Sequence, residues 1–176
     1  MSEQPAVHLP AWLKPMNRLI MAMNWLGIEF GTFHVLTVPG RKTGRLISTP
    51  VSPFMVEGER YVLSLPGIAW VRNARAVGWG IVARGRRQEG VYLAEVSPAD
   101  RPRIARHFPL QVPHGVRFFQ LPADPAAFEA AAGRFVLFRL EPVSSRASWQ
   151  RASRAFSPRD GGAARPRTPG SSARSR

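Results

Sequence analysis

Two glycines flank a short basic segment that reads Gly40-Arg41-Lys42-Thr43-Gly44. A turn of this kind can present backbone N–H groups while Arg41 and Lys42 add positive charge, so the segment suits a phosphate group. It is not a P-loop, because only three residues separate the glycines and no Gly-Lys-Ser/Thr sequence follows. The alternative interpretation is a basic hairpin turn that is simply solvated.

A second polar cluster follows the loop Ser64-Leu65-Pro66-Gly67, in the segment Ala69-Trp70-Val71-Arg72-Asn73. The pattern predicts a short helix at about residues 68–76, which would bring a helix N-terminus, an indole, a guanidinium and an amide together. A helix N-terminus attracts anions, and an indole can form a wall for an aromatic ligand. The alternative is that Trp70 belongs to the core and Asn73 to the helix surface.

The chain is strongly basic. Its 176 residues include 25 basic and 11 acidic ones, which gives a formal net charge of +14. This excess favours an anionic partner, which could be nucleic acid, a lipid surface or a phosphorylated small molecule. Cysteine is absent, which excludes disulfides, iron–sulfur clusters and thiolate zinc sites, and the four histidines lack the spacing of a metalloprotease. No metal site is predicted.

Residues 144–176 carry eight arginines and one acidic residue, Asp160, so they supply half of the net charge. They are rich in Pro, Gly, Ser and Arg and poor in large apolar residues, which predicts a disordered basic tail after a domain at 1–143. The tail is either an arm for RNA or anionic lipid or an incidental solvated segment.

Residues 11–27 predict a leading amphipathic helix, because large apolar side chains recur on one face: Trp12, Met16, Leu19, Met23 and Leu26. This helix either covers a sheet or lies on a membrane surface. The chain shows neither a signal-peptide pattern nor a stretch of about 18 apolar residues. We therefore expect a cytoplasmic protein, with peripheral contact at the inner face of the membrane left open.

Between these ends the pattern predicts strands joined by hairpins, with helices around them. The β-prone stretches are Phe33–Val38, 46–56, Arg60–Leu63, 79–85, 89–96 and Phe135–Leu140. Ser97 is predicted to cap one helix and Asp124-Pro125 to begin another. Strong βαβ alternation is missing, so we expect an α+β fold built on a small barrel of about six antiparallel strands.

Taken in this order, the segments resemble the deazaflavin-dependent nitroreductase family of split β-barrel oxidoreductases. The resemblance rests on the turn from Gly40 to Gly44, Pro50 in the next strand, Ser64 in its loop, and the Trp-x-x-Asn run from Trp70 to Asn73. It covers roughly residues 10–143 and implies an FMN-binding-like split β-barrel that binds coenzyme F420, with FMN as the alternative cofactor. Coenzyme F420 is a two-electron hydride carrier with a phosphodiester and an oligoglutamate tail.

The resemblance also implies roles for single residues. The turn would contact the phosphate or the tail, Ser64 and the loop after it would face the deazaflavin edge, and Asn73 would hydrogen-bond on the phosphate side. The implied cofactor-binding residues are Arg41, Lys42, Thr43, Pro50, Ser64, Trp70 and Asn73. Four further arginines could extend a cationic groove: Arg45, Arg72, Arg84 and Arg86.

The implied reaction is hydride transfer from reduced F420 to a planar electrophile such as a quinone, an enone or a nitroaromatic, with catalysis mostly by positioning. Many relatives carry an arginine where this chain has Ile47, and some line the substrate side with tyrosines that are missing from the stretch Phe108 to Phe119. His114 is the only titratable side chain in the loop from Pro109 to Gly115, so it is the candidate proton donor. Ser64 and His114 are thus the two candidate catalytic residues. The alternative is a solvated loop histidine, with water as the proton donor.

Two other functions stay open at this point. The chain could be a non-enzymatic split-barrel binder of a flavin-like cofactor, or a basic protein that binds membrane surfaces or nucleic acid. Nucleic acid is disfavoured, because no RNA-binding signature is present and aromatic residues are not interleaved with the basic tail. A homodimer is also open.

Overall fold

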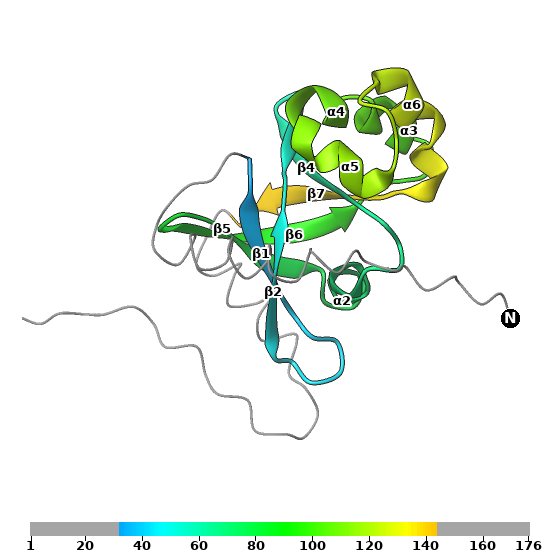
Figure 1. Ribbon diagram of the computed structural model, residues 1–176. Coiled ribbons are helices and arrows are strands. Elements are labelled where there is room, and N and C mark those ends of the chain that lie inside the picture. The colour runs from blue at the N-terminus through cyan, green and yellow to red at the C-terminus, as the bar shows by residue number, and fades with distance from the viewer. Residues whose placement is uncertain (1–31, 144–176) are drawn as a thin grey trace, which may run out of the picture.

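The computed structural model describes residues 32–143, which build one curled antiparallel sheet with helices packed on it (Figure 1). The helix predicted at 11–27 and the tail predicted at 144–176 lie outside the described residues. No helix within residues 32–143 is long and apolar enough to cross a membrane.

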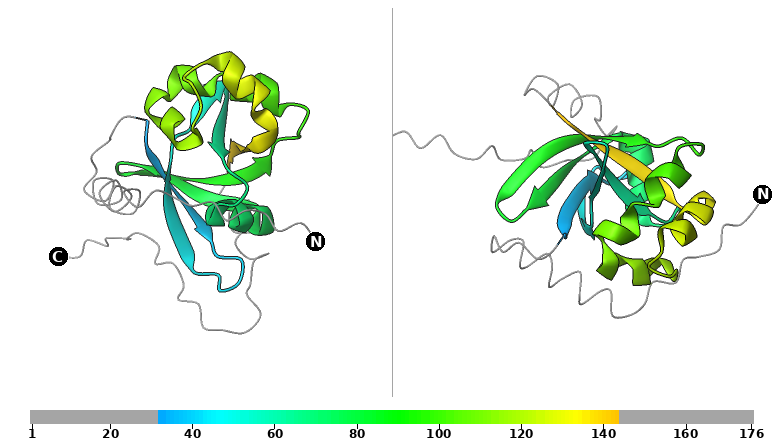
Figure 2. Two further views of the ribbon diagram at one scale, coloured as in Figure 1. Left: turned by 45° about the vertical axis from the view of Figure 1, so that its right-hand side comes forward. Right: turned by 90° about the horizontal axis from the view of Figure 1, so that it is seen from above.

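The sheet has seven strands in the order β2-β1-β5-β6-β7-β4-β3, and every neighbouring pair is antiparallel. The strands are β1 (His34–Pro39), β2 (Leu46–Val51), β3 (Phe54–Val56), β4 (Glu59–Ser64), β5 (Trp79–Arg84), β6 (Arg87–Glu95) and β7 (Val136–Pro142). The sheet curls without closing, so β2 and β3 are its two edges (Figure 2). This is an α+β split β-barrel, as the sequence predicts.

The number of strands exceeds the prediction because the stretch 46–56 is divided into β2 and β3. Pro53 lies in the break between them, and Pro50 lies within β2. A proline has no N–H to donate to a ladder, which confines it to edge strands and bends. Both prolines therefore sit where the sequence places them, on an edge and at a bend.

One face of the curled sheet forms an apolar core with α2 (Ala69–Val77), and we call this region the barrel interior. Its buried residues are Leu36, Val38, Val51, Val62, Trp70, Val71, Ala74, Val82, Val91, Leu93, Val136, Phe138 and Leu140. The core contains every second residue of the strands, because successive side chains point to opposite faces. The barrel interior fixes α2 against the sheet.

The C-terminal end of α2 is held by a glycine and an ion pair. Gly78 adopts the left-handed conformation at φ 74°, and its N–H donates to the carbonyl of Ala74 at 2.8 Å. In the last turn, Arg75 Nε donates to Glu95 Oε2 at 2.7 Å, and this bond lowers the pKa of the Glu95 carboxyl. The chain then enters β5, whose Ile81 pairs with Thr37 of β1. The C-terminal half of β1 and α2 are thereby placed at the same end of the barrel interior.

A second core lies on the other face of β4 and β7, under a group of short helices that we call the helical lobe (Figure 1). Its elements are α3 (Arg101–Ala105), α4 (Phe108–Gln111), η1 (Pro113–Gly115), α5 (Val116–Phe119), α6 (Pro125–Ala130) and η2 (Ala132–Arg134). Phenylalanines dominate this core, with Phe108 edge-to-face on Phe54 and Phe119 at centroid distances of 5.4 and 5.2 Å.

The two helix starts predicted for the helical lobe differ in outcome. Asp124 caps α6 as expected, because its carboxylate accepts from the N–H of Ala127 at 3.1 Å. The prediction for Ser97 is wrong: its hydroxyl donates to the side chain of Asp100 at 2.7 Å and caps no helical N–H. The helix begins only at Arg101.

Candidate functional site

The basic turn between β1 and β2 is closed by its own backbone. The N–H of Gly40 donates to the carbonyl of Arg45 at 2.8 Å, and the N–H of Gly44 donates to the carbonyl of Gly40 at 2.7 Å. Gly44 has φ 68°, a conformation that other residues rarely adopt, so a glycine is required there. The closed turn leaves the side chains of Arg41, Lys42 and Thr43 exposed.

Asn73 of α2 holds this turn. Its side chain is buried at 3% exposure, and its Oδ1 accepts from the backbone N–H of Arg41 at 3.3 Å and from Arg41 Nη1 at 3.2 Å. Both groups of Arg41 can only donate, so the atom that faces them must be the carbonyl oxygen of the amide. The structure thus brings the two polar motifs of the sequence into contact, with Asn73 as the residue that positions the turn.

The surroundings of the turn are cationic. Arg41, Lys42, Arg45 and Arg72 are all exposed, and none of them pairs with a carboxylate within residues 32–143. The first turn of α2 contains no acidic residue, and Ile68 at its N-cap provides no side-chain hydrogen bond. The helix dipole therefore adds positive potential at the start of α2, where Arg72 lies and near which Asn73 holds Arg41. We call the turn, Asn73 and the start of α2 the cationic site.

Trp70 and Ser64 lie beneath this surface rather than on it. Trp70 is 6% exposed and packs on Phe138 at a ring centroid distance of 5.5 Å, within the barrel interior. Ser64 is 4% exposed, ends β4 and pairs with Val136 of β7. The loop 65–68 is half-buried and connects Ser64 to α2, so both residues belong to the same end of the barrel.

The register of the sheet separates three predicted residues from the turn. Pro50 lies opposite Val35, near the start of β1, whereas Leu46 and Ile47 are the β2 residues beside the turn. Arg84 and Arg86 belong to the hairpin between β5 and β6, beyond the pair Val35–Ala83. The prediction that these two arginines extend the groove of the turn is therefore wrong, because they lie at the other end of β1.

His114 lies near that other end as well. Its Nε2 hydrogen-bonds with Oγ1 of Thr32 at 3.0 Å, and its ring lies 4.8 Å from that of Phe33, both just before β1. His114 is exposed, while Ser64 is buried at the end of β4 that leads to α2. The structure therefore does not gather the two candidate catalytic residues at one point.

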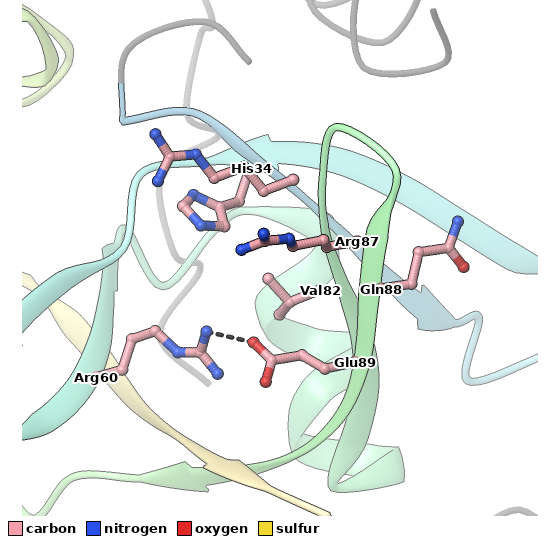
Figure 3. A pocket seen from close by; sticks show the side chains of 7 residues that line it. His34, Arg60, Val82, Arg87, Gln88 and Glu89 are labelled. Carbon is pink, nitrogen blue, oxygen red and sulfur yellow. Dashed lines mark hydrogen bonds and ion pairs between the residues drawn. The ribbon is translucent and has the colours of Figure 1, made fainter. Parts of the chain in front are cut away.

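The sequence did not single out a cavity of about 280 Å³ at this end of the barrel interior (Figure 3). Its lining residues are His34, Arg60, Val82, Arg84, Arg87, Gln88 and Glu89, contributed by β1, β4, β5 and β6. A second hollow of about 260 Å³ lies beside α3 and includes the ion-paired residues Glu95, Arg103 and Arg139. No group of three metal-ligating side chains occurs in the part of the chain that the structure describes.

Comparison with known proteins does not assign the chain to a family. No family model matches the sequence, and no curated protein matches it. Solved structures that resemble the chain include the Agrobacterium tumefaciens protein Atu2129 of unknown function, at 15% identity and a TM-score of 0.49 over 79% of this chain. The match spans only 59% of that protein.

Two further solved structures are of proteins named for an activity. A putative pyridoxamine 5'-phosphate oxidase from Listeria innocua is 14% identical, with a TM-score of 0.44 over 73% of this chain and 94% of its own. An F420 reductase is 15% identical, with a TM-score of 0.41 over 69% of this chain and 93% of its own. The strand order, rather than these similarities, identifies the split barrel.

Proposed function

We propose that this chain is an F420-dependent oxidoreductase, which transfers a hydride from reduced F420 to a planar electrophile such as a quinone, an enone or a nitroaromatic. The observation that carries the proposal is the contact between Arg41 and the buried amide of Asn73. This contact fixes a basic turn against the start of a helix, and the two elements are the ones that the family resemblance assigns to the cofactor phosphate and tail.

The donors of the cationic site fit such a cofactor. Arg41 contacts Asn73 of α2, Lys42 and Arg45 belong to the same turn as Arg41, and Arg72 belongs to α2 itself. None of these four cations pairs with a carboxylate within residues 32–143, and the start of α2 has no side-chain cap. A phosphodiester followed by several carboxylates can neutralise all four charges, whereas the single phosphate of FMN can neutralise fewer. This difference in charge supports F420 over FMN.

The chain's own residues would act by binding and orienting. F420, when bound, supplies two-electron hydride chemistry. Arg41 and Lys42 would hold phosphate or carboxylate oxygens, and Thr43 could donate its hydroxyl to them. Trp70 would support α2 from within the core, and Ser64 with the loop 65–68 would border the ring system, since they belong to the same end of the barrel. Pro50 would shape the edge strand without touching the phosphate.

Proton supply to the product is assigned to water. His114 contacts residues just before β1, whereas the basic turn follows β1, and the six residues of that strand extend over roughly 17 Å. A hydroquinone anion is stable enough to take its proton from solvent. The replacement His114→Ala is therefore expected to change quinone reduction less than about tenfold, since general acid catalysis by one side chain contributes more than that where it is required.

A non-enzymatic binder of the same cofactor is the second candidate. It is favoured by the burial of Ser64 and by its separation from His114, because within residues 32–143 these two candidate catalytic side chains do not meet.

The two candidates are separated by titration and turnover of the full chain. Fluorescence titration with F420, FMN and a short oligonucleotide should give saturable binding that is tightest for F420. Oxidation of reduced F420 by a quinone, followed by absorbance, should then be accelerated by the protein. Tighter binding of FMN than of F420 would contradict the assignment of F420 as the cofactor. F420 binding without turnover of any of the three substrate classes would favour the non-enzymatic binder.

A further inference from the structure

The two edges of the sheet differ in whether their backbone groups are bonded. At the β3 edge, Gln111 of α4 bonds to both backbone groups of Met55. Its Oε1 accepts from the Met55 N–H at 2.9 Å, and its Nε2 donates to the Met55 carbonyl at 2.7 Å. A side-chain amide thus takes the place that a further strand would occupy, and it closes this edge.

The β2 edge has no such closure within residues 32–143, and the register shows which of its groups face outward. The N–H of Gly40 donates to the carbonyl of Arg45, so these two residues extend the β1–β2 ladder as a hydrogen-bonded pair. Hydrogen-bonded pairs recur at every second residue, so the next one joins Val38 to Ile47. The β2 residues between these pairs direct their backbone groups away from β1. They are Leu46, Ser48 and Pro50.

This open edge is short, uncharged and apolar. Leu46 and Ser48 each offer an N–H and a carbonyl, and no backbone hydrogen bond within residues 32–143 beyond the β1–β2 ladder uses them. Pro50 has no N–H, so it ends the edge as a template for pairing. The side chains of Leu46 and Ile47 are 53% and 45% exposed, and β2 contains no charged residue. Charges on an edge strand commonly oppose pairing with another chain, and this strand lacks them.

The charges beside the open edge are all positive. Arg45 directly precedes β2, and Arg41 and Lys42 belong to the same turn. All three are exposed, and none pairs with a carboxylate within residues 32–143. A second copy of the chain would bring another formal charge of +14 to this edge, whereas an acidic chain would be attracted to it. Charge therefore favours an acidic partner over a second copy.

We propose that the open edge of β2 binds an extended acidic segment of a partner protein, which adds a strand to the sheet. Leu46 and Ser48 would each exchange two backbone hydrogen bonds with the segment, and the exposed side chains of Leu46 and Ile47 would contact its apolar residues on opposite faces. The inference does not rest on the proposed F420 chemistry.

The direction of the bound segment follows from the sheet. Every neighbouring pair of strands in it is antiparallel, and antiparallel pairing is the more stable arrangement. β2 runs away from the basic turn, so an antiparallel segment runs toward Arg45. Its acidic residues should therefore follow its paired residues rather than precede them.

The test is a fluorescence-anisotropy titration of the full chain with a labelled peptide of sequence Val-Thr-Val-Thr-Val-Glu-Glu. Saturable binding is expected, and it should weaken at least about threefold when the glutamates are moved to the other end or replaced by glutamines. Methylation of the backbone nitrogens in the Val-Thr stretch keeps the charges but removes the donors, so it should weaken binding at least about tenfold. Absence of saturable binding, or equal binding of the methylated peptide, would overturn the proposal.

Two replacements of Ser48 give a matched pair on the protein side. Ser48→Pro removes an outward N–H and no bond of the β1–β2 ladder, so peptide binding should fall at least about fivefold. Ser48→Ala keeps this N–H and loses only the hydroxyl contact with Thr37 Oγ1 at 2.8 Å, so binding should change less than about twofold. Equal peptide affinity in the two variants would contradict the pairing, and the methylated peptide decides the matter if Ser48→Pro does not fold.

Two further measurements separate this inference from other accounts of the same edge. F420 affinity should be unchanged in both Ser48 variants, because Ser48 is not among the residues assigned to the cofactor. Loss of peptide binding with F420 binding intact would therefore support the strand edge by itself, and failure of F420 to bind the wild type would leave the peptide result standing. Sedimentation of the wild type without peptide should show a monomer. Self-association that Ser48→Pro abolishes would assign the edge to a second copy and overturn the proposal.

Discussion

The two ends of the barrel interior differ in where their charged side chains lie. At the α2 end, Trp70, Val71 and Ala74 close the interior with apolar side chains, and the cations stand outside on the turn. At the His34 end, Arg60, Arg84 and Arg87 line a cavity that reaches Val82 of the core. Cations on an exposed turn are screened by salt, whereas those in a hollow are screened less and shift the pKa of a neighbour. The arginines at the two ends should therefore respond differently to salt.

The largest expected effect concerns the apolar closure at the α2 end. Trp70→Ala should lower the free energy of unfolding by about 3–5 kcal/mol, because it empties a buried site that packs on Phe138. Arg87→Gln at the other end should change it by less than about 0.5 kcal/mol. Urea denaturation of both variants measures the contrast, and similar losses would mean that the two ends do not differ as described.

A smaller loss is expected where Asn73 joins the turn to α2. Asn73→Ala should cost about 1–2 kcal/mol, because two hydrogen bonds to Arg41 are lost from a buried side chain. It should also weaken F420 binding, since the turn is no longer held against the helix.

Asn73→Asp separates these two roles of the side chain. A carboxylate can still accept from both donors of Arg41, so stability should be largely retained, while its negative charge should weaken F420 binding. Denaturation and F420 titration of both variants give the comparison. Full F420 affinity in Asn73→Ala would show that the contact does not position the turn.

The His34 end should make stability depend on pH. The folded pKa of His34 is below its usual value, so the unfolded chain binds the proton more readily. The stabilising contribution is present above about pH 6.5 and is lost as the pH falls through the folded pKa. Between about pH 7.5 and pH 5.5 the wild type should lose more stability than His34→Gln. Parallel curves for the two proteins would contradict the assignment.

The smallest effect should come from an added cation at the turn. Ile47 is 45% exposed beside the turn, opposite Val38 of β1. Ile47→Arg should strengthen F420 binding by a few-fold and leave stability nearly unchanged, since the present side chain is already exposed. A matched Met55→Arg change, at an exposed position of the edge strand β3, should leave F420 binding unaltered.

Local patterns in the sequence predicted most of the strands and helices in the described residues. Strands, hairpins and the Asp124 cap depend on near neighbours. The family resemblance assigned the turn and the Trp-x-x-Asn segment to the same cofactor, which implied that they lie near each other. Ser97 failed as a cap because the helix begins only at Arg101, four residues later, with Asp100 at its N-cap position, and the Ser97 hydroxyl donates to the Asp100 side chain instead.

The cavity at the His34 end could not be predicted in this way. Its residues come from four strands, and Arg60 and His34 are not on neighbouring strands in the sheet. The same cause explains the misplaced Arg84 and Arg86, which belong to the far end of β1 only because of the register of β5 with β1. Positions along the chain do not specify which strands converge when the sheet curls.

The most direct test of the account is the F420 affinity of a charge-reversed turn. Arg41→Glu/Lys42→Glu is compared with Arg117→Glu/Arg134→Glu, which makes the same change in net charge at exposed positions of the helical lobe. The account predicts a loss of at least about a hundredfold in the turn variant, since each cation–anion contact is worth roughly 1.5–3 kcal/mol. The lobe variant should bind within about threefold of the wild type, whose own affinity falls as salt rises. Equal affinity in the two variants would show that the basic turn is not where F420 binds.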